Sequence, residues 1–243
     1  MDNKFTYFDF IAYIVPGAFL LGILSLVFGS GTFLVLSDNP AIDTLLFLVV
    51  SFALGGIVHQ LSRYLVEPAV KRIFWKGRFY SEIYLVKKYG LCKNPIRLQI
   101  LNNAEAIFQF DKNALDSLES GSLVASSPDP HVVSHQICRR FDYYTMDRNL
   151  AKKGHTANAL YSLYRTMTLA MFIGVIIFAV SLNWITPNLS FTAKVVLTGF
   201  SLLGAILFLM RTRNEGQRYV EGKLGAVSSN QLESEIKSGN QNI

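Results

Sequence analysis

The stretch at residues 166–184 reads TMTLAMFIGVIIFAVSLNW and contains no acidic or basic side chain. At about 1.5 Å rise per residue, roughly 20 helical residues cross the hydrocarbon core of a bilayer, which is about 30 Å thick. Three other stretches, at residues 10–36, 42–60 and 191–210, are similarly apolar and similarly long. The sequence therefore predicts an all-α integral membrane protein with four transmembrane helices.

The basic residues are distributed unevenly around these stretches. None of the 23 Lys and Arg residues lies in the short connections at residues 37–41 and 185–190, sixteen lie between Arg63 and Arg165, and five follow Met210. Cytoplasmic loops of membrane proteins carry an excess of Lys and Arg. This distribution predicts that both termini and the middle segment face the cytoplasm. The net charge of +6 then serves orientation and contact with anionic lipid headgroups, and we do not expect direct binding of nucleic acid.

The predicted domain order follows from this topology. We expect a first transmembrane hairpin at 1–66, a mostly helical cytoplasmic insert at 67–165, a second hairpin at 166–213 and a largely disordered cytoplasmic tail at 214–243. Glu67-Pro68 marks the predicted end of the second helix, because proline disfavours helical backbone in the residue before it.

Local patterns predict further helices inside the insert. They lie at residues 82–89 with Gly90 as C-cap, 95–110, 113–118 and 131–144, with a loop at 121–130. In the tail, we expect helix to about Lys223 and disorder from Ala226 onward.

Pro16-Gly17 interrupts the first apolar stretch one to two turns after its start. Proline removes a backbone hydrogen bond and tends to kink a helix, and in a membrane the freed carbonyl needs a neighbouring helix or a water. We therefore expect this turn to face protein rather than lipid.

Small residues recur four positions apart in the apolar stretches, a spacing that lets helix backbones approach closely. With the Pro-Gly turn, the candidates for helix packing or oligomer contacts are Pro16, Gly17, Ser51, Gly55, Gly56, Ala170, Gly174, Ser201 and Ala205. Two interpretations stay open: packing within one four-helix bundle, or association of copies into a homo-oligomer. His59 and Gln60 are expected at the membrane interface, because Arg63 follows within one turn.

The insert contains basic and aromatic residues that are candidates for contact with lipid or a cytosolic protein partner. They are Lys71, Arg72, Trp75, Lys76, Arg139, Arg140, Arg148 and His155. The stretch from Lys71 to Lys76 has the composition of a membrane-surface segment.

Two residue patterns are candidates for a metal site and for catalysis. His131, His135 and Cys138 have i, i+4, i+7 spacing, and His155 or Cys92 could add a fourth metal ligand. The preferred interpretation is surface histidines and a core cysteine, with no metal and no cofactor, since a paired Cys-x-x-Cys or His-Glu-x-x-His is missing.

Arg148 and His155 resemble the Arg-(x4–6)-His motif of HEPN ribonucleases, in which both residues serve phosphodiester cleavage. The same residues fit a basic interfacial patch with Lys152 and Lys153. The sequence has no phosphate-binding Gly-rich loop and no Gly-x-Ser-x-Gly, and we expect no enzyme activity.

Residues 7–17, YFDFIAYIVPG, resemble the opening of small bacterial multi-pass proteins that have an aromatic approach, a Tyr-x-x-Pro-Gly turn and an apolar continuation. Some similar four-span proteins are membrane accessories of anti-phage defence systems, such as the membrane subunit of Kiwa-type systems and CRISPR-associated membrane accessories. The faces of Gly, Ser and Ala, the uncharged apolar stretches and the basic insert favour a non-enzymatic inner-membrane protein that oligomerises and couples the bilayer to a cytosolic partner. In the defence setting that the resemblance implies, it would act as a sensor or a membrane-perturbing component. The alternatives are a channel or pore in its own right and a membrane-tethered HEPN-like ribonuclease.

Overall fold

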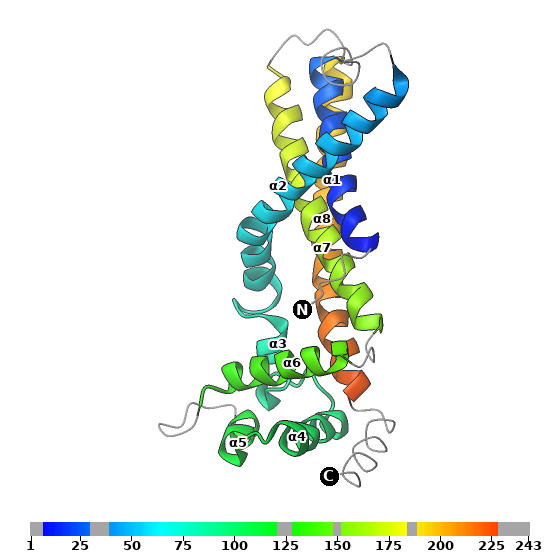
Figure 1. The fold of residues 1–243 in the computed structure, drawn as a ribbon. Coiled ribbons are helices and arrows are strands. Elements are labelled where there is room, and N and C mark those ends of the chain that lie inside the picture. Colours follow the sequence, from blue (N-terminus) through cyan, green and yellow to red (C-terminus); the bar gives the residue numbers. More distant parts are fainter. Residues whose placement is uncertain (1–6, 30–38, 121–127, 148–151, 184–188, 228–243) are drawn as a thin grey trace. The chain divides into compact units, whose positions relative to one another are not determined.

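The structure is a computed structural model that describes residues 7–29, 39–120, 128–147, 152–183 and 189–227. These residues form helices and irregular connections and contain no strand (Figure 1). The elements are α1 (Tyr7–Phe28), α2 (Pro40–Phe74), α3 (Tyr80–Ile83), the 3-10 helix η2 (Lys87–Tyr89), α4 (Asn94–Phe108), α5 (Lys112–Ser120), α6 (Pro130–Asp147), α7 (Lys152–Ser181) and α8 (Phe191–Val227).

Within the described residues, four helices are long and apolar enough to cross a membrane: α1, α2, α7 and α8. This confirms the predicted all-α class and the four apolar segments.

The chain divides into two compact units. Unit 1 comprises Met1–Val70 and Asn158–Glu215, and unit 2 comprises Lys71–Ala157 and Gly216–Ile243. Three helices, α2, α7 and α8, contribute residues to both units without a break. Of these three helices, α8 has the longest segment in unit 2, because it continues to Val227.

The predicted end of the second helix at Glu67-Pro68 is wrong, because α2 continues through Pro68 to Phe74. A proline inside a helix costs about 3 kcal/mol or more, since one backbone hydrogen bond is lost. Packing on both sides of the proline offsets this cost: Val66 and Val70 are 4% and 0% exposed, and the Glu67 carboxylate accepts a hydrogen bond from Arg165. Likewise, α1 runs through Pro16 as one helix.

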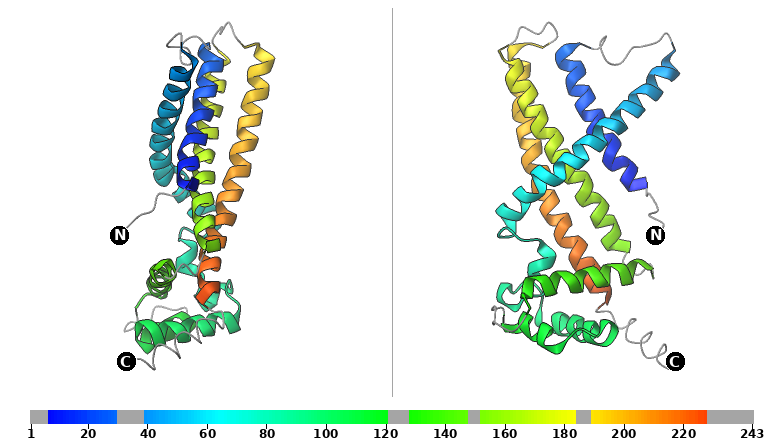
Figure 2. Two further views of the ribbon diagram at one scale, coloured as in Figure 1. Left: turned by 45° about the vertical axis from the view of Figure 1, so that its right-hand side comes forward. Right: turned by 60° about the vertical axis from the view of Figure 1, so that its left-hand side comes forward.

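In unit 1, α1 and α7 are the most enclosed helices. About half of the apolar window of each is buried, 44% and 50%, whereas α2 and α8 bury only 17% of theirs. In the left view of Figure 2, α1 and α7 lie between α2 and α8. A core of Met167 and Met171 from α7 and Ala205 from α8 joins these helices, with Phe19 of α1 packed against it. The wide exposed apolar faces of α2 and α8 match what contact with lipid requires.

In unit 2, the helices pack around apolar side chains that are almost fully enclosed. They include Leu85, Ile100, Leu118, Ile137, Phe141, Leu224 and Val227. Helix α6 packs against α3 and α5, and η2 packs against α5.

The helices predicted at 95–110, 113–118 and 131–144 are confirmed as α4, α5 and α6. The helix predicted at 82–89 consists of α3 and η2, separated by three residues. Gly90 adopts φ 61° in the left-handed region and is the C-cap, as predicted. Helix α8 extends beyond Lys223, and Val227 is buried, so disorder does not begin at Ala226. Residues 121–127 of the predicted loop and 228–243 of the tail lie outside the described residues.

Candidate functional site

The backbones of α1 and α2 meet at two glycines. A Cβ atom added at Gly17 would overlap the carbonyl of Ser51, and one added at Gly55 would overlap the carbonyl of Tyr13. Only a residue without a side chain permits so close an approach. Pro16 and Gly17 are both buried, so the predicted turn does face protein.

The remaining small residues bring α7 and α8 together. A Cβ added at Gly174 would lie 3.3 Å from Ser201 Oγ and 2.8 Å from Cδ1 of Ile23. Ala170, Ser201 and Ala205 are at most 1% exposed. Of the predicted packing candidates, all except the half-buried Gly56 are buried. The structure therefore places these residues in packing inside one chain, and the homo-oligomer stays a prediction.

A buried polar cluster joins α2 to α7, and it begins at His59. This side chain is 3% exposed, and its ring centroid lies 4.8 Å from that of Tyr13. The distance from its Nδ1 to Thr166 Oγ1 is 3.1 Å. Thr166 Oγ1 also donates to the Ser162 carbonyl at 2.8 Å. The structure encloses His59 between Tyr13 of α1 and Thr166 of α7, and its depth at the membrane interface stays a prediction.

Arg165 is the centre of the same cluster. Its guanidinium, on a residue 4% exposed, donates from Nη1 to Glu67 Oε2 at 3.0 Å and from Nε to Ser62 Oγ at 3.1 Å. Ser62 in turn donates to the His59 carbonyl at 2.7 Å. The Arg165 guanidinium also lies 5.4 Å from the centroid of the Tyr161 ring. A buried charge needs such partners, because an unpaired one in an apolar surrounding is very unfavourable.

The sequence did not predict this cluster, because Arg165 was assigned to the end of the insert and not to the third span. A signal was present in the sequence: His59, Ser62 and Glu67 lie on one side of α2, and all three precede the predicted helix end at Pro68.

In unit 2, the predicted partner residues divide into buried and exposed ones. Trp75 is 4% exposed, with its ring 5.9 Å from that of Tyr80. It therefore packs inside unit 2 and is not a surface residue. Lys71 Nζ lies 3.1 Å from the centroid of the Phe79 ring, and Lys76 Nζ lies 5.3 Å from that of Tyr89.

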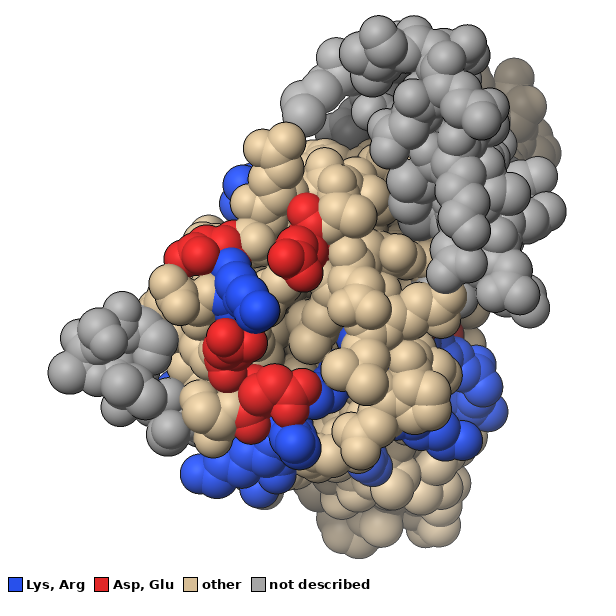
Figure 3. Space-filling model, turned by 90° about the horizontal axis from the view of Figure 1, so that it is seen from below, with Lys and Arg blue, Asp and Glu red and all other residues tan. Residues whose placement is uncertain are grey.

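The other candidates on this unit are exposed or undescribed. Arg72, Arg139 and Arg140 are exposed, and Arg140 donates to the Phe108 carbonyl at 3.1 Å. Arg148 and the side chain of His155 lie outside the described residues, so the structure does not bear on the ribonuclease motif. Figure 3 shows acidic and basic side chains next to one another on the face that it presents.

The three possible metal ligands of α6 contact α3. His135 Nδ1 lies 3.0 Å from Ser81 Oγ, Cys138 Sγ lies 3.6 Å from the Ser81 carbonyl, and His131 Nδ1 lies 3.3 Å from the Glu82 carbonyl. In the part of the chain that the structure describes, no three His, Cys, Asp or Glu residues form a metal site. Burial raises the pKa of the Cys138 thiol to about 12.

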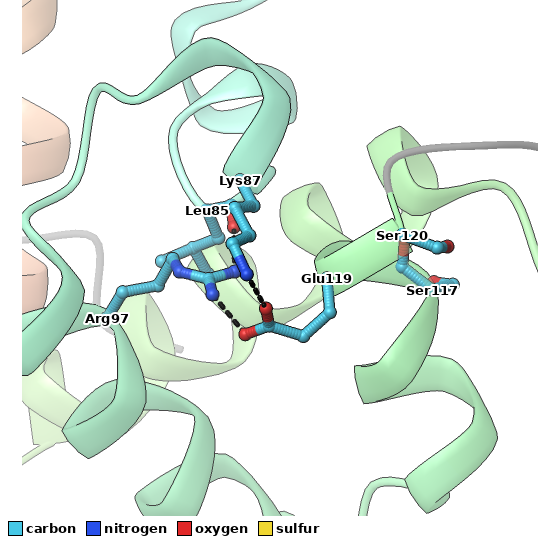
Figure 4. A network of polar contacts seen from close by, with 6 residues as sticks. All are labelled: Leu85, Lys87, Arg97, Ser117, Glu119 and Ser120. Atoms are coloured by element: carbon cyan, nitrogen blue, oxygen red, sulfur yellow. Dashed lines mark hydrogen bonds and ion pairs between the residues drawn. The ribbon is translucent and has the colours of Figure 1, made fainter.

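Glu119 of α5 binds two cations of unit 2 (Figure 4). Lys87 Nζ lies 3.0 Å from its Oε2, and Arg97 Nη2 pairs with its Oε1. Arg97 is 2% exposed, and its Nη1 also donates to the Leu85 carbonyl at 3.4 Å. Although partial burial alone would raise the pKa of Glu119, Lys87 and Arg97 together hold it below its usual value.

The fold and these contacts define a helical protein with four candidate membrane spans, joined by glycine-mediated backbone contact and buried polar side chains. Comparison with protein families, curated proteins and solved structures found no match for this chain.

Proposed function

We propose that this chain is a multi-pass protein of a bacterial inner membrane that couples the bilayer to a cytosolic protein partner. In this proposal, α1–α2 and α7–α8 form two transmembrane hairpins, and the insert and both termini face the cytoplasm. The distribution of Lys and Arg around the four apolar helices supports this orientation. In a defence setting, the protein would sense a disturbance of the membrane or, when triggered, permeabilise it.

The observation that carries the proposal is the continuity of α8. This helix places Ala205 in the apolar core of unit 1 and buries Leu224 and Val227 in unit 2. The fourth candidate span is therefore connected to the core of unit 2 by an uninterrupted helical backbone and not by a loop. Such a connection supports a coupling function.

The proposal assigns no catalytic role. Among the described residues, three ion pairs join neighbouring helices: Arg165 pairs with Glu67, Arg97 with Glu119 and Lys223 with Asp142. Charges arranged in this way stabilise contacts between helices.

The test is purification of the tagged full-length protein in a mild detergent, followed by mass spectrometry and mass photometry. We expect a cytosolic protein in stoichiometric amount. The charge reversals Arg72→Glu and Arg140→Glu, at exposed positions of unit 2, should release it. The matched control reverses Lys93 and Lys112, which are also exposed, and should retain it.

Two results would contradict the coupling function. One is a wild-type protein that carries no stoichiometric partner. The other is a partner that is lost equally with the control reversals. A defined oligomer without a partner would favour the pore, and ion flux into liposomes would then be the next measurement.

A further inference from the structure

Unit 2 contains a cavity of about 110 Å³ between α3, α6 and the last turns of α8. Its lining includes His135, Cys138, Arg139, Asp142, Tyr219 and Lys223. About 10–15 Å³ of such space holds one water molecule, so the cavity has room for several waters or one small polyatomic ion. It is well below the 300–1,000 Å³ typical of sites for drug-sized ligands.

The only carboxylate of this lining is already engaged. Asp142 Oδ2 accepts a hydrogen bond from the Tyr219 hydroxyl at 2.8 Å, and Oδ1 pairs with Lys223 Nζ. Lys223 is 4% exposed and also donates to the Tyr219 hydroxyl at 3.0 Å. An ammonium has three N–H donors, and these contacts use two of them. One donor of a buried cation is thus left for whatever occupies the cavity.

Arg139 adds a second positive charge to the lining. Its Nη2 donates to the Tyr143 hydroxyl at 3.3 Å, and its guanidinium lies 5.7 Å from the centroid of the Tyr143 ring. Neither contact neutralises its charge, and no acidic partner of Arg139 is found among the described residues. The cavity therefore has two cations for one carboxylate, and that carboxylate is paired with Lys223.

We propose that this cavity is a binding site for a small oxyanion that presents a phosphate or a carboxylate group. The planar guanidinium of Arg139 matches the two oxygens of such a group, and hydrogen bonds to charged groups are the stronger ones in proteins. The Lys223 ammonium supplies a further donor from inside the cavity. This proposal does not depend on the cytosolic partner proposed above, because it follows from the charges that line the cavity alone.

The test is titration of the purified full-length protein with inorganic phosphate and, separately, with acetate, by calorimetry and by thermal unfolding at constant ionic strength. At least one anion should bind with a defined stoichiometry and raise the unfolding temperature. Arg139→Gln should weaken binding about tenfold or more. Arg140→Gln is the matched control, because it removes the neighbouring exposed cation, which does not line the cavity, and it should bind as the wild type does.

A second variant tests the buried cation. Asp142→Asn with Lys223→Gln removes both charges together, so no unpaired charge is left behind, and it should also abolish anion binding. If neither anion binds the wild-type protein, or if Arg139→Gln and Arg140→Gln bind equally well, the proposal is overturned.

Titration in nanodiscs separates two sources of the anion. If phosphate binds more weakly when phosphatidylglycerol replaces part of the phosphatidylcholine, a lipid headgroup competes for the site. If the affinity is unchanged, the site takes a free anion.

Discussion

Gly55 and Gly56 are neighbours in sequence but have different roles. A Cβ at Gly55 would overlap the backbone of α1, whereas a Cβ at Gly56 would meet only Tyr13 Cδ1 at 3.8 Å, an ordinary contact. The small-residue pattern predicts close approach at both positions, and only the geometry of the crossing helices separates them.

The change Gly55→Ala should therefore destabilise unit 1 by about 3 kcal/mol, at the upper end of typical overpacking costs, because a carbonyl of α1 cannot yield as a side chain can. Gly56→Ala should be neutral or slightly stabilising, because alanine favours helix over glycine by about 1 kcal/mol. Thermal unfolding in detergent measures both. Equal effects of the two changes would contradict the close crossing of α1 and α2.

Glu119 gives a second prediction at the residue scale. Its pKa is lowered in the folded protein by Lys87 and Arg97, so its contribution to stability is present above its unfolded pKa of about 4.3 and is lost as the pH falls through the lower folded value. Glu119→Gln should destabilise the protein by about 1–2 kcal/mol at pH 7, since Glu119 is partly exposed and solvent screens its charge.

The difference between wild type and Glu119→Gln should decrease below about pH 4.3. Unfolding by denaturant at a series of pH values measures this. Glu105→Gln, at an exposed position of α4, is the control. A difference that stays constant from pH 7 to pH 3 would exclude the ion pairs as its cause.

At the scale of elements, α2 shows how packing decides where a helix ends. The sequence contains a helix-ending signal at Glu67-Pro68, yet α2 continues to Phe74. The reason lies about a hundred residues away, where Arg165 of α7 binds Glu67. A local pattern contains no information about such a partner.

Features that depend on local sequence could be predicted, whereas features that depend on distant residues could not. The apolar stretches and the Gly90 cap depend on local chemistry, and they are confirmed. The enclosed position of Trp75 depends on its packing against Tyr80 of α3. The residue types of the stretch from Lys71 to Lys76 alone suggested a membrane surface, because basic and aromatic residues are common there. The burial of His59 likewise depends on a distant residue, Thr166 of α7.

The α2–α7 cluster can be tested with a double-mutant cycle. Glu67→Leu leaves the buried Arg165 without its carboxylate and should destabilise the protein by about 3–5 kcal/mol. Glu67→Leu combined with Arg165→Met should cost clearly less, because an apolar pair leaves no unpaired charge. Unfolding free energies of the two single changes and the double change give the coupling. Additive effects would show that the two side chains do not interact.

At the scale of the whole molecule, the two units share helices rather than being connected by loops. Helix α8 belongs to both, and its residues are buried in each: Ala205 in unit 1 and Leu224 in unit 2. One uninterrupted helix thus contains both a candidate membrane span and residues that are buried in unit 2. The orientation of the chain in the membrane decides whether unit 2 faces the cytosol.

The orientation can be tested with single cysteines in a Cys92→Ser, Cys138→Ser background. Ala41→Cys lies in an exposed turn at the start of α2, and Asp116→Cys lies on the exposed side of α5. If Lys and Arg orient the chain as proposed, a membrane-impermeant maleimide should label Ala41→Cys in intact spheroplasts. It should label Asp116→Cys only after the membrane is opened. The reverse pattern would place unit 2 outside the cell, where no cytosolic partner could reach it, and the coupling proposal would fail with it.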